Sequence, residues 1–212
     1  MDKVTLFLVS MAFLLNAPVK AQGSAESLVE KTASKIEKDG GVTMKLKIAV
    51  MEGLETDTRE VTFDMSGRSF RSADDENTIW FDGKTLWRGS DFGSGIEEIY
   101  ISEPLSDDIA VINITDLLRT HEGFSVEEKG RDTFTLASDG SGGGIAGIRS
   151  ITVKVDPATY TLRSATVLFA EDVGDIRADI SVLEYTPGRK FNDRTFVCPV
   201  SDFKDADIID LR

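Results

Sequence analysis

Histidine and cysteine are common in metal sites and in nucleophilic catalysis, and this sequence has one of each, His121 and Cys198. A zinc site needs several Cys or His ligands at defined spacings, which two residues do not supply. A Ser-His-Asp arrangement would have to use His121, which precedes Glu122-Gly123 at the end of a predicted helix. Because a cation is favourable at a helix C-terminus, we interpret His121 as a helix cap.

Cys198 lies in an apolar stretch, with Phe196 and Val200 on either side. The chain has no second cysteine, so an internal disulfide is excluded. In an exported protein a single cysteine can pair with another chain, but a buried cysteine that packs as a small hydrophobe is commoner. We therefore predict that Cys198 is buried.

The glycine-rich stretch at residues 142–147 matches the GxGxxG string of dinucleotide-binding sites. In such a site the string opens a helix, whose N-terminus meets the pyrophosphate. Here the string leads into residues 148–155, whose alternating apolar residues predict a strand, and no Lys-Ser or Lys-Thr pair follows it. We predict a flexible hairpin loop and no bound cofactor.

Carboxylates are abundant, and a general acid and base pair can be sought among them. All the acidic pairs lie in or beside polar turns, where solvated charge is the default, and the acidic residues at 202–210 lack EF-hand spacing. The pairs are Glu97-Glu98, Asp107-Asp108 and Asp172 with Asp175. We predict no catalytic residue, no metal ligand and no enzymatic activity.

Residues 1–21 have the pattern of a signal peptide. Lys3 precedes an apolar run at 4–15, and the residues at 19–21 predict cleavage before Gln22. The run is well short of the roughly 20 apolar residues of a membrane-spanning helix. The residue directly after the cleavage point is Gln22 and not a cysteine, so a lipid anchor is not expected. We expect an exported protein in which residues 22–212 form a single domain.

The chain has a net charge of −13. The leader holds two lysines and one aspartate, so residues 22–212 are one unit more negative. Nucleic acids and anionic membrane surfaces recruit patches of Lys and Arg, so this charge argues against both as partners.

The stretch at residues 78–87 predicts a β-hairpin around Asp82-Gly83, a dipeptide typical of a two-residue type I′ turn. Such a turn would set the cross-strand pairs Phe81–Lys84, Trp80–Thr85, Ile79–Leu86 and Thr78–Trp87. Alternation then gives two apolar faces, one with Ile79, Phe81 and Leu86 and the other with Trp80 and Trp87. The hairpin needs cover on both sides, from a second layer of protein or from an apolar ligand. The pattern alone does not separate these two alternatives.

The remaining pattern predicts one amphipathic helix followed by a meander of nine to eleven antiparallel strands. Apolar residues recur at helical spacing over residues 24–38, and strict alternation begins at Val42. Short helices are expected between 102 and 120. The predicted fold class is α+β, mainly β: an incomplete, strongly curved antiparallel β-barrel covered by the N-terminal helix and short lid helices.

Several motifs, in this order, resemble the LolA-like periplasmic outer-membrane lipoprotein carriers. They are DGKTLW at 82–87, the strand at 97–101, INITDLL at 112–118 and VDPATYTLRSATVLF at 155–169. The closing IIDLR at 208–212 is similar to the endings of LolA-like proteins from Bacteroidetes-type bacteria. The resemblance covers nearly all of residues 22–212. It rests on the order of the motifs along the chain and not on any single motif.

The resemblance implies a monomeric carrier that shelters lipoprotein acyl chains, or another lipid, in an apolar cavity and performs no covalent chemistry. It implies transfer from an inner-membrane exporter to an outer-membrane acceptor. Members of the family often tie the lid to the barrel with an Arg just before the turn at Ser66-Gly67, where this chain has Met65. An alternative is a sensor or binding module of the same fold, which binds another lipid or a regulatory protein.

Apolar residues of the first strands and of the central hairpin are the predicted lining of the cavity. The lining candidates are Met44, Leu46, Ile48, Phe63, Met65, Phe70, Trp80 and Trp87. The predicted lid residues are Ile109, Ile112, Leu117 and Leu118.

Overall fold

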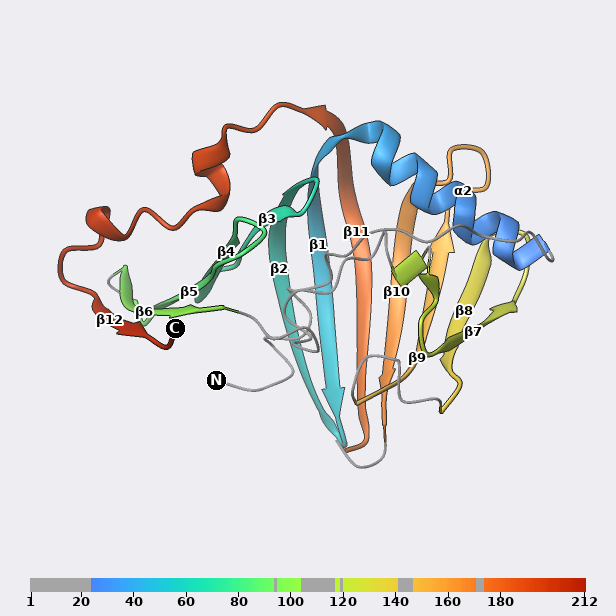
Figure 1. The fold of residues 1–212 in the computed structure, drawn as a ribbon. Helices are drawn as coiled ribbons and strands as arrows, with labels where there is room; N and C mark the ends of the chain where they lie inside the picture. The colour runs from blue at the N-terminus through green and yellow to red at the C-terminus, as the bar shows by residue number, and fades with distance from the viewer. Residues whose placement is uncertain (1–23, 94, 104–116, 119, 141–146, 171–173) are drawn as a thin grey trace.

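The computed structural model describes residues 24–93, 95–103, 117–118, 120–140, 147–170 and 174–212 (Figure 1). The predicted signal peptide and two of the predicted lid residues, Ile109 and Ile112, lie outside these ranges, as do Asp107, Asp108 and Asp172.

The first described element is the helix α2, Ser24–Asp39, which confirms the helix predicted at 24–38. Leu28, Val29 and Ile36 are buried along one face, together with Thr32 and Ala33. The helix ends where Gly40 adopts a φ of +65° and its N–H donates to the carbonyl of Glu37 at 3.1 Å. Glycine adopts this left-handed conformation at no steric cost, which makes it a common helix terminator.

Twelve strands form one sheet, and its first half runs along the chain in order. The first six strands are β1 (Gly41–Glu52), β2 (Glu55–Ser66), β3 (Ser69–Ala73), β4 (Asn77–Phe81), β5 (Leu86–Asp91) and β6 (Ile96–Ser102). The other six are β7 (Phe124–Glu128), β8 (Thr133–Ser138), β9 (Ile148–Val155), β10 (Leu162–Phe169), β11 (Ile176–Arg189) and β12 (Asp207–Asp210).

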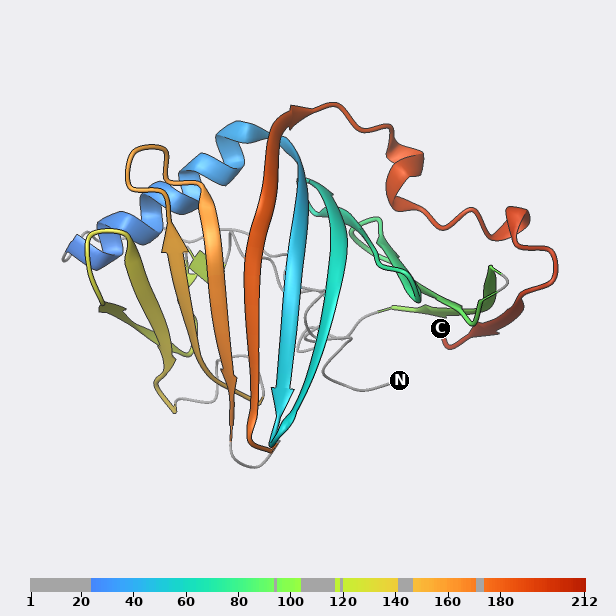
Figure 2. The same cartoon turned by 180° about the vertical axis from the view of Figure 1, so that it is seen from behind.

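The sheet has the strand order β12-β6-β5-β4-β3-β2-β1-β11-β10-β9-β8-β7 and does not close on itself. Two antiparallel series, β1 to β6 and β7 to β11, are joined through the long pairing of β1 with β11. The sheet curves, and α2 lies across the ends of β10 to β8 (Figures 1 and 2). This is the incomplete, curved β-barrel that the sequence predicts. Among the described residues, no helix is long and apolar enough to cross a membrane.

Side chains alternate between the two faces of the sheet, and each face of the first half has its own apolar cluster. We call the face that packs with α2 the inner face, and its buried side chains the inner cluster. In β1, Val42, Met44 and Leu46 are buried on it, whereas Lys45 and Lys47 are exposed on the opposite, outer face. The outer face carries a second cluster, which we call the outer cluster: Trp80, Trp87, Ile99, Ile101 and Cys198.

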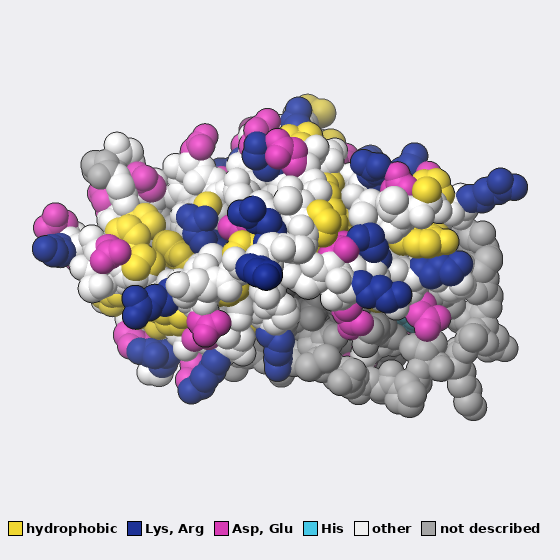
Figure 3. Space-filling view, turned by 90° about the horizontal axis from the view of Figure 1, so that it is seen from above, with side chains coloured by type: hydrophobic (Ala, Val, Ile, Leu, Met, Phe, Trp, Pro, Cys, Tyr) yellow, Lys and Arg dark blue, Asp and Glu magenta, His cyan; other side chains and the backbone are white. Residues whose placement is uncertain are grey.

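The C-terminal segment between β11 and β12 covers the outer cluster. This segment leaves β11 and returns along β4 to β6 (Figure 1), through the short 3₁₀ helices η2 (Asp193–Phe196) and η3 (Val200–Asp202). Val200, Phe203 and Ala206 pack against the outer cluster, and the Phe203 ring lies 6.2 Å from that of Trp80. Seen from above, hydrophobic side chains gather toward this end of the molecule, while basic and acidic side chains are mixed elsewhere (Figure 3).

The central hairpin forms, but its predicted register is wrong. Phe81 pairs with Leu86 and Trp80 with Trp87, so the loop has four residues instead of two. The carboxylate of Asp82 accepts hydrogen bonds from the backbone N–H groups of Lys84 (2.9 Å) and Thr85 (2.8 Å), which stabilises the longer turn. The shift is two residues, so each side chain keeps its face, and the prediction of two apolar faces is confirmed.

The strand β12 is absent from the sequence prediction of nine to eleven antiparallel strands. It pairs parallel with β6, and the N–H of Leu211 extends the pairing to the carbonyl of Ile101 at 2.8 Å. A four-residue strand with an aspartate at each end has little β-propensity of its own. Its conformation depends on the edge of β6, which local sequence does not reveal.

Asp39 fastens the end of α2 to β11. Its carboxylate accepts a hydrogen bond from the Tyr185 hydroxyl at 2.7 Å and pairs with Lys35 one helical turn earlier. The Asp39 side chain is only 10% exposed. Burial, and then the adjacent Asp39 carboxylate, raise the pKa of Tyr185, so its hydroxyl stays protonated and remains a donor.

We expect Tyr185→Phe to lower the free energy of unfolding by about 1–2 kcal/mol, because it removes a hydrogen bond to a poorly solvated carboxylate. Urea denaturation measures this change. Tyr100→Phe is the matched control, since the Tyr100 hydroxyl donates to the Glu98 carboxylate over a longer 3.2 Å in a more solvated place. Equal losses in the two variants would contradict a special role for Asp39.

Candidate functional site

The cross-strand register arranges the inner face of β1 to β5 in rows. The first, which we call the apolar row, crosses five strands and is buried throughout: Val42, Met65, Phe70, Phe81 and Leu86. The Phe70 ring lies 5.6 Å from that of Phe63 and 5.5 Å from that of Phe81. Such separations are typical of favourable aromatic pairs. Three strands therefore share a continuous aromatic surface.

The neighbouring row, which we call the mixed row, changes from apolar to polar as it crosses the sheet. It consists of Met44, Phe63, Ser72, Ile79, Arg88 and Tyr100, on β1 to β6 in turn. Met44, Phe63 and Ile79 are buried, whereas Arg88 and Tyr100 are half-buried. The inner face thus has an apolar part over β1 to β4 and a polar edge over β5 and β6.

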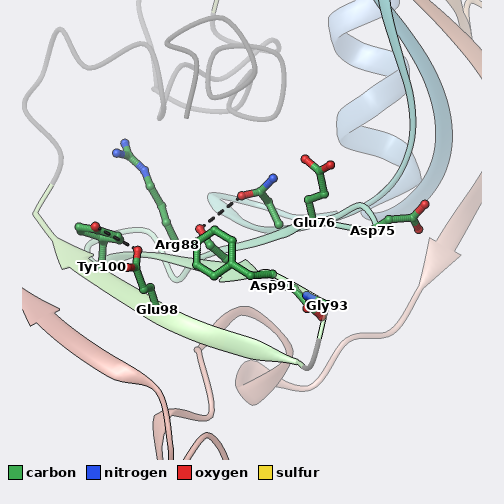
Figure 4. A pocket seen from close by; sticks show the side chains of 10 residues that line it. Asp75, Glu76, Arg88, Asp91, Gly93, Glu98 and Tyr100 are labelled. Carbon is green, nitrogen blue, oxygen red and sulfur yellow. Dashed lines mark hydrogen bonds between the residues drawn. The ribbon is translucent and has the colours of Figure 1, made fainter.

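A pocket of about 790 Å³ lies at this polar edge (Figure 4). We call it the edge pocket; its lining includes Asn77, Arg88, Ser90, Asp91, Glu98 and Tyr100. The Tyr100 hydroxyl donates to Glu98 at 3.2 Å, and Ser90 donates to Asn77 at 3.5 Å. The hydrogen bond to Glu98 raises the pKa of Tyr100.

Asp91 holds the turn that closes one side of the edge pocket. Its Oδ1 accepts hydrogen bonds from the N–H groups of Gly93 (2.7 Å) and Gly95 (3.1 Å). Gly93 has a φ of +112° and Gly95 a φ of +109°, a region that side-chain-bearing residues rarely adopt. The glycines at 93 and 95 therefore let this short turn place the Asp91 carboxylate at the rim of the pocket.

The eight predicted lining residues do not share one surface. Six of them belong to the inner cluster: Met44, Leu46, Ile48, Phe63, Met65 and Phe70. Trp80 and Trp87 lie in the outer cluster, beneath the C-terminal segment. Adjacent residues on a strand face opposite ways, so the alternation that brings Ile79, Phe81 and Leu86 inside sends both tryptophans outside.

Sequence reasoning missed the edge pocket, although a signal for it was present. In β5 and β6, Arg88, Ser90, Glu98 and Tyr100 stand at inner-face positions, as the alternation of their strands shows. Glu98 pairs with Ser90 and is half-buried, whereas Glu97 lies at a register shift between β5 and β6 and is exposed. These two carboxylates therefore lie in different environments.

Leu117 and Leu118, two of the four predicted lid residues, are buried in the inner cluster, at 7% and 1% exposure. His121 ends the turn that carries them. Its Nε2 lies 2.8 Å from the carbonyl of Leu118, its N–H donates to Leu117 at 3.1 Å, and its φ is +50°. The predicted capping role of His121 is confirmed.

Cys198 is buried at 4% exposure, as predicted. Burial raises the pKa of its thiol to about 12, so the thiolate is scarce at neutral pH. Within the described part of the chain, no three His, Cys, Asp or Glu side chains are grouped to hold a metal ion.

Ser72 is a polar residue inside the apolar part of the inner face. It is 1% exposed, it pairs with Phe63 on one side and Ile79 on the other, and its hydroxyl has no hydrogen-bond partner among the described residues. A buried hydroxyl without a partner costs free energy, which a ligand that offers a polar atom would recover.

No protein-family model and no curated protein matches this chain. Among solved structures, an uncharacterized conserved protein from Thermus thermophilus is similar at 12% identity and a TM-score of 0.54, over 89% of this chain and 99% of that chain. At this identity the likeness shows a shared fold alone.

Two further structures are similar at lower TM-scores. A LolA superfamily protein from Nitrosomonas europaea has 13% identity and a TM-score of 0.45, over 83% of this chain and 98% of that chain. The Mycobacterium tuberculosis lipoprotein LppX has 11% identity and a TM-score of 0.40, over 81% of this chain and 99% of that chain. These scores are too low to bear on function.

We expect Ser72→Ala to leave the free energy of unfolding of the protein unchanged or to raise it by about 1 kcal/mol, because it deletes a buried hydroxyl that has no partner among the described residues. Thr135→Val is the control: Thr135 is also buried, but its hydroxyl lies 2.9 Å from that of Thr152, so its removal should destabilise the protein. Urea denaturation of both variants is the measurement. An equal loss in Ser72→Ala would show that its hydroxyl is satisfied.

Proposed function

We propose that the chain is a periplasmic carrier that shelters the acyl chains of lipoproteins during their transfer from the inner to the outer membrane. In this proposal residues 1–21 are a cleaved signal peptide and residues 22–212 are a single lipid-binding domain. It is supported by the order of LolA-like motifs along the sequence. The observation that carries it is the apolar inner face of an open, curved sheet.

An acyl chain gains free energy on such a surface mainly by leaving water, at about 0.8 kcal/mol per CH₂. The apolar row offers side chains on five adjacent strands, and Phe63, Phe70 and Phe81 present a continuous aromatic surface. The outer face has its own protein cover, from the C-terminal segment. The inner face is therefore the one that we assign to the ligand.

In this proposal the segment with Ile109, Ile112, Leu117 and Leu118 is a lid that leaves the inner face when a lipid enters. Displacing a buried leucine costs roughly 1.5–3 kcal/mol, which burial of acyl CH₂ groups offsets. A carrier needs these quantities to be nearly balanced, because cargo that is held too tightly is not handed on.

Met65 occupies the position where LolA-like carriers often have the arginine that ties the lid. It is 4% exposed and lies between Val42 and Phe70 in the apolar row. We therefore propose that the lid is held by apolar contacts instead of by an ionic latch. The exporter and the acceptor remain those implied by the resemblance, and the carrier acts as a monomer without covalent chemistry.

We expect residues 22–212 to bind a fluorescent long-chain fatty acid saturably. Ile48→Val should weaken this binding about fourfold, since it removes one buried CH₂, about 0.8 kcal/mol, from the inner face. Ile101→Val is the matched control: it makes the same change at a buried position in the outer cluster. It should destabilise the protein comparably and leave the affinity unchanged.

Two results would count against the carrier. If the protein binds the fatty acid no more strongly than an unrelated acidic protein does, the proposal that it binds a lipid is wrong. A stoichiometric protein partner that copurifies without lipid would favour a sensor that uses the same fold.

A further inference from the structure

The edge pocket continues the surface on which we place the acyl chain. Along the mixed row, Ile79 pairs with Arg88, and Arg88 pairs with Tyr100. The chain-binding part of the face therefore meets the pocket at a single strand boundary, between β4 and β5. A ligand that lies along this row has its apolar part over Phe63 and Ile79 and its other end in the pocket.

The pocket contains charges of both signs. Arg88 extends from β5 into it, while Asp75, Glu76, Asp91 and Glu98 supply carboxylates (Figure 4). The Glu76 carboxylate pairs with Arg59 at 2.7 Å, and the Asp91 carboxylate accepts hydrogen bonds from the closing turn. A purely anionic head group would meet these carboxylates, and a purely cationic one would meet Arg88. A zwitterionic head group offers an oppositely charged partner to the arginine and to the carboxylates alike.

Ser72 is a second, independent indication of a ligand on this row. Its buried hydroxyl has no partner within the described ranges, and Ser72 lies two strands from Arg88. At about 4.8 Å per strand, this places it roughly 10 Å from the pocket's arginine, on the apolar side. This is where the ester between the head and the chain of an amphiphile would lie.

From these observations we infer that the edge pocket binds the zwitterionic head group of a phospholipid-type amphiphile. Its phosphate lies against Arg88, and its primary ammonium group lies against Glu98. The guanidinium is a planar donor that matches phosphate oxygens, and an ammonium group is a compact donor that suits carboxylates. This inference rests on one part of the proposed function, the acyl chain on the inner face. The lipid group of a lipoprotein has no phosphate, so the phospholipid is a second ligand for the same face.

The test compares three lipids with the same single acyl chain: a lysophosphatidylethanolamine, a lysophosphatidylglycerol and an uncharged monoacylglycerol. Binding to residues 22–212 is measured by displacement of a fluorescent fatty acid. We expect the ethanolamine lipid to bind about tenfold more tightly than the glycerol lipid, since a hydrogen bond between charged groups contributes about that factor. The monoacylglycerol reports on chain binding alone.

Glu98→Gln should reduce the preference for the ethanolamine lipid severalfold and leave monoacylglycerol binding unchanged. Glu97→Gln is the matched control, because Glu97 is the neighbouring residue on β6 but is exposed and does not line the edge pocket. It should change neither affinity.

Each outcome decides between the two proposals. If the monoacylglycerol binds but the ethanolamine lipid binds no more tightly than the glycerol lipid, or if Glu98→Gln and Glu97→Gln behave alike, the head-group inference is overturned and the acyl-chain proposal stands. If none of the three lipids binds, both are overturned.

Discussion

Successive side chains of a strand point to opposite faces, so a sheet with apolar residues on both faces must be covered twice. This constraint organises the whole protein. In β4 and β5, Phe81 and Leu86 require cover on the inner face, and Trp80 and Trp87 require it on the outer face. The C-terminal segment supplies the outer cover, and β12 fixes that segment by pairing with β6. With the outer face sealed by protein, the inner face is the surface that the fold can offer to an apolar ligand.

Periodicity accounts for the parts of this architecture that the sequence predicts. The helical spacing of Leu28, Val29 and Ile36 and the alternation of Val42 to Ile48 are local patterns, and the structure confirms both elements and their buried faces. What periodicity does not encode is a side chain's hydrogen bond to a turn, or the edge that a short strand joins. Hydrogen bonds to the Asp82 carboxylate stabilise a longer central turn, so the hairpin register differs from the predicted one. The strand β12 forms by pairing with β6, so it is not predicted from its own sequence.

The candidate site was predicted in part for a related reason. Six of the predicted lining residues lie on the inner face, whereas Trp80 and Trp87 lie on the opposite face of the hairpin. The sequence pattern shows that this second face is apolar but does not tell whether protein or ligand covers it. The edge pocket was missed because Arg88, Glu98 and Tyr100 are polar, and polar residues in short strands resemble a solvated surface. Only the cross-strand register places Arg88 and Tyr100 in line with Ser72 and Phe63, with Glu98 in the adjacent row. The inner face then suits an amphiphile, with a chain at one end of a row and a head group at the other.

The central claim is that this inner face holds a lipid in the native protein. Native mass spectrometry of the protein, purified from its native source without detergent, tests it most directly. We expect a species heavier than the polypeptide by one acylated molecule, which organic extraction removes and chemical analysis identifies by its fatty acids. A protein recovered only at its bare mass, or bound only to another protein, would contradict the account.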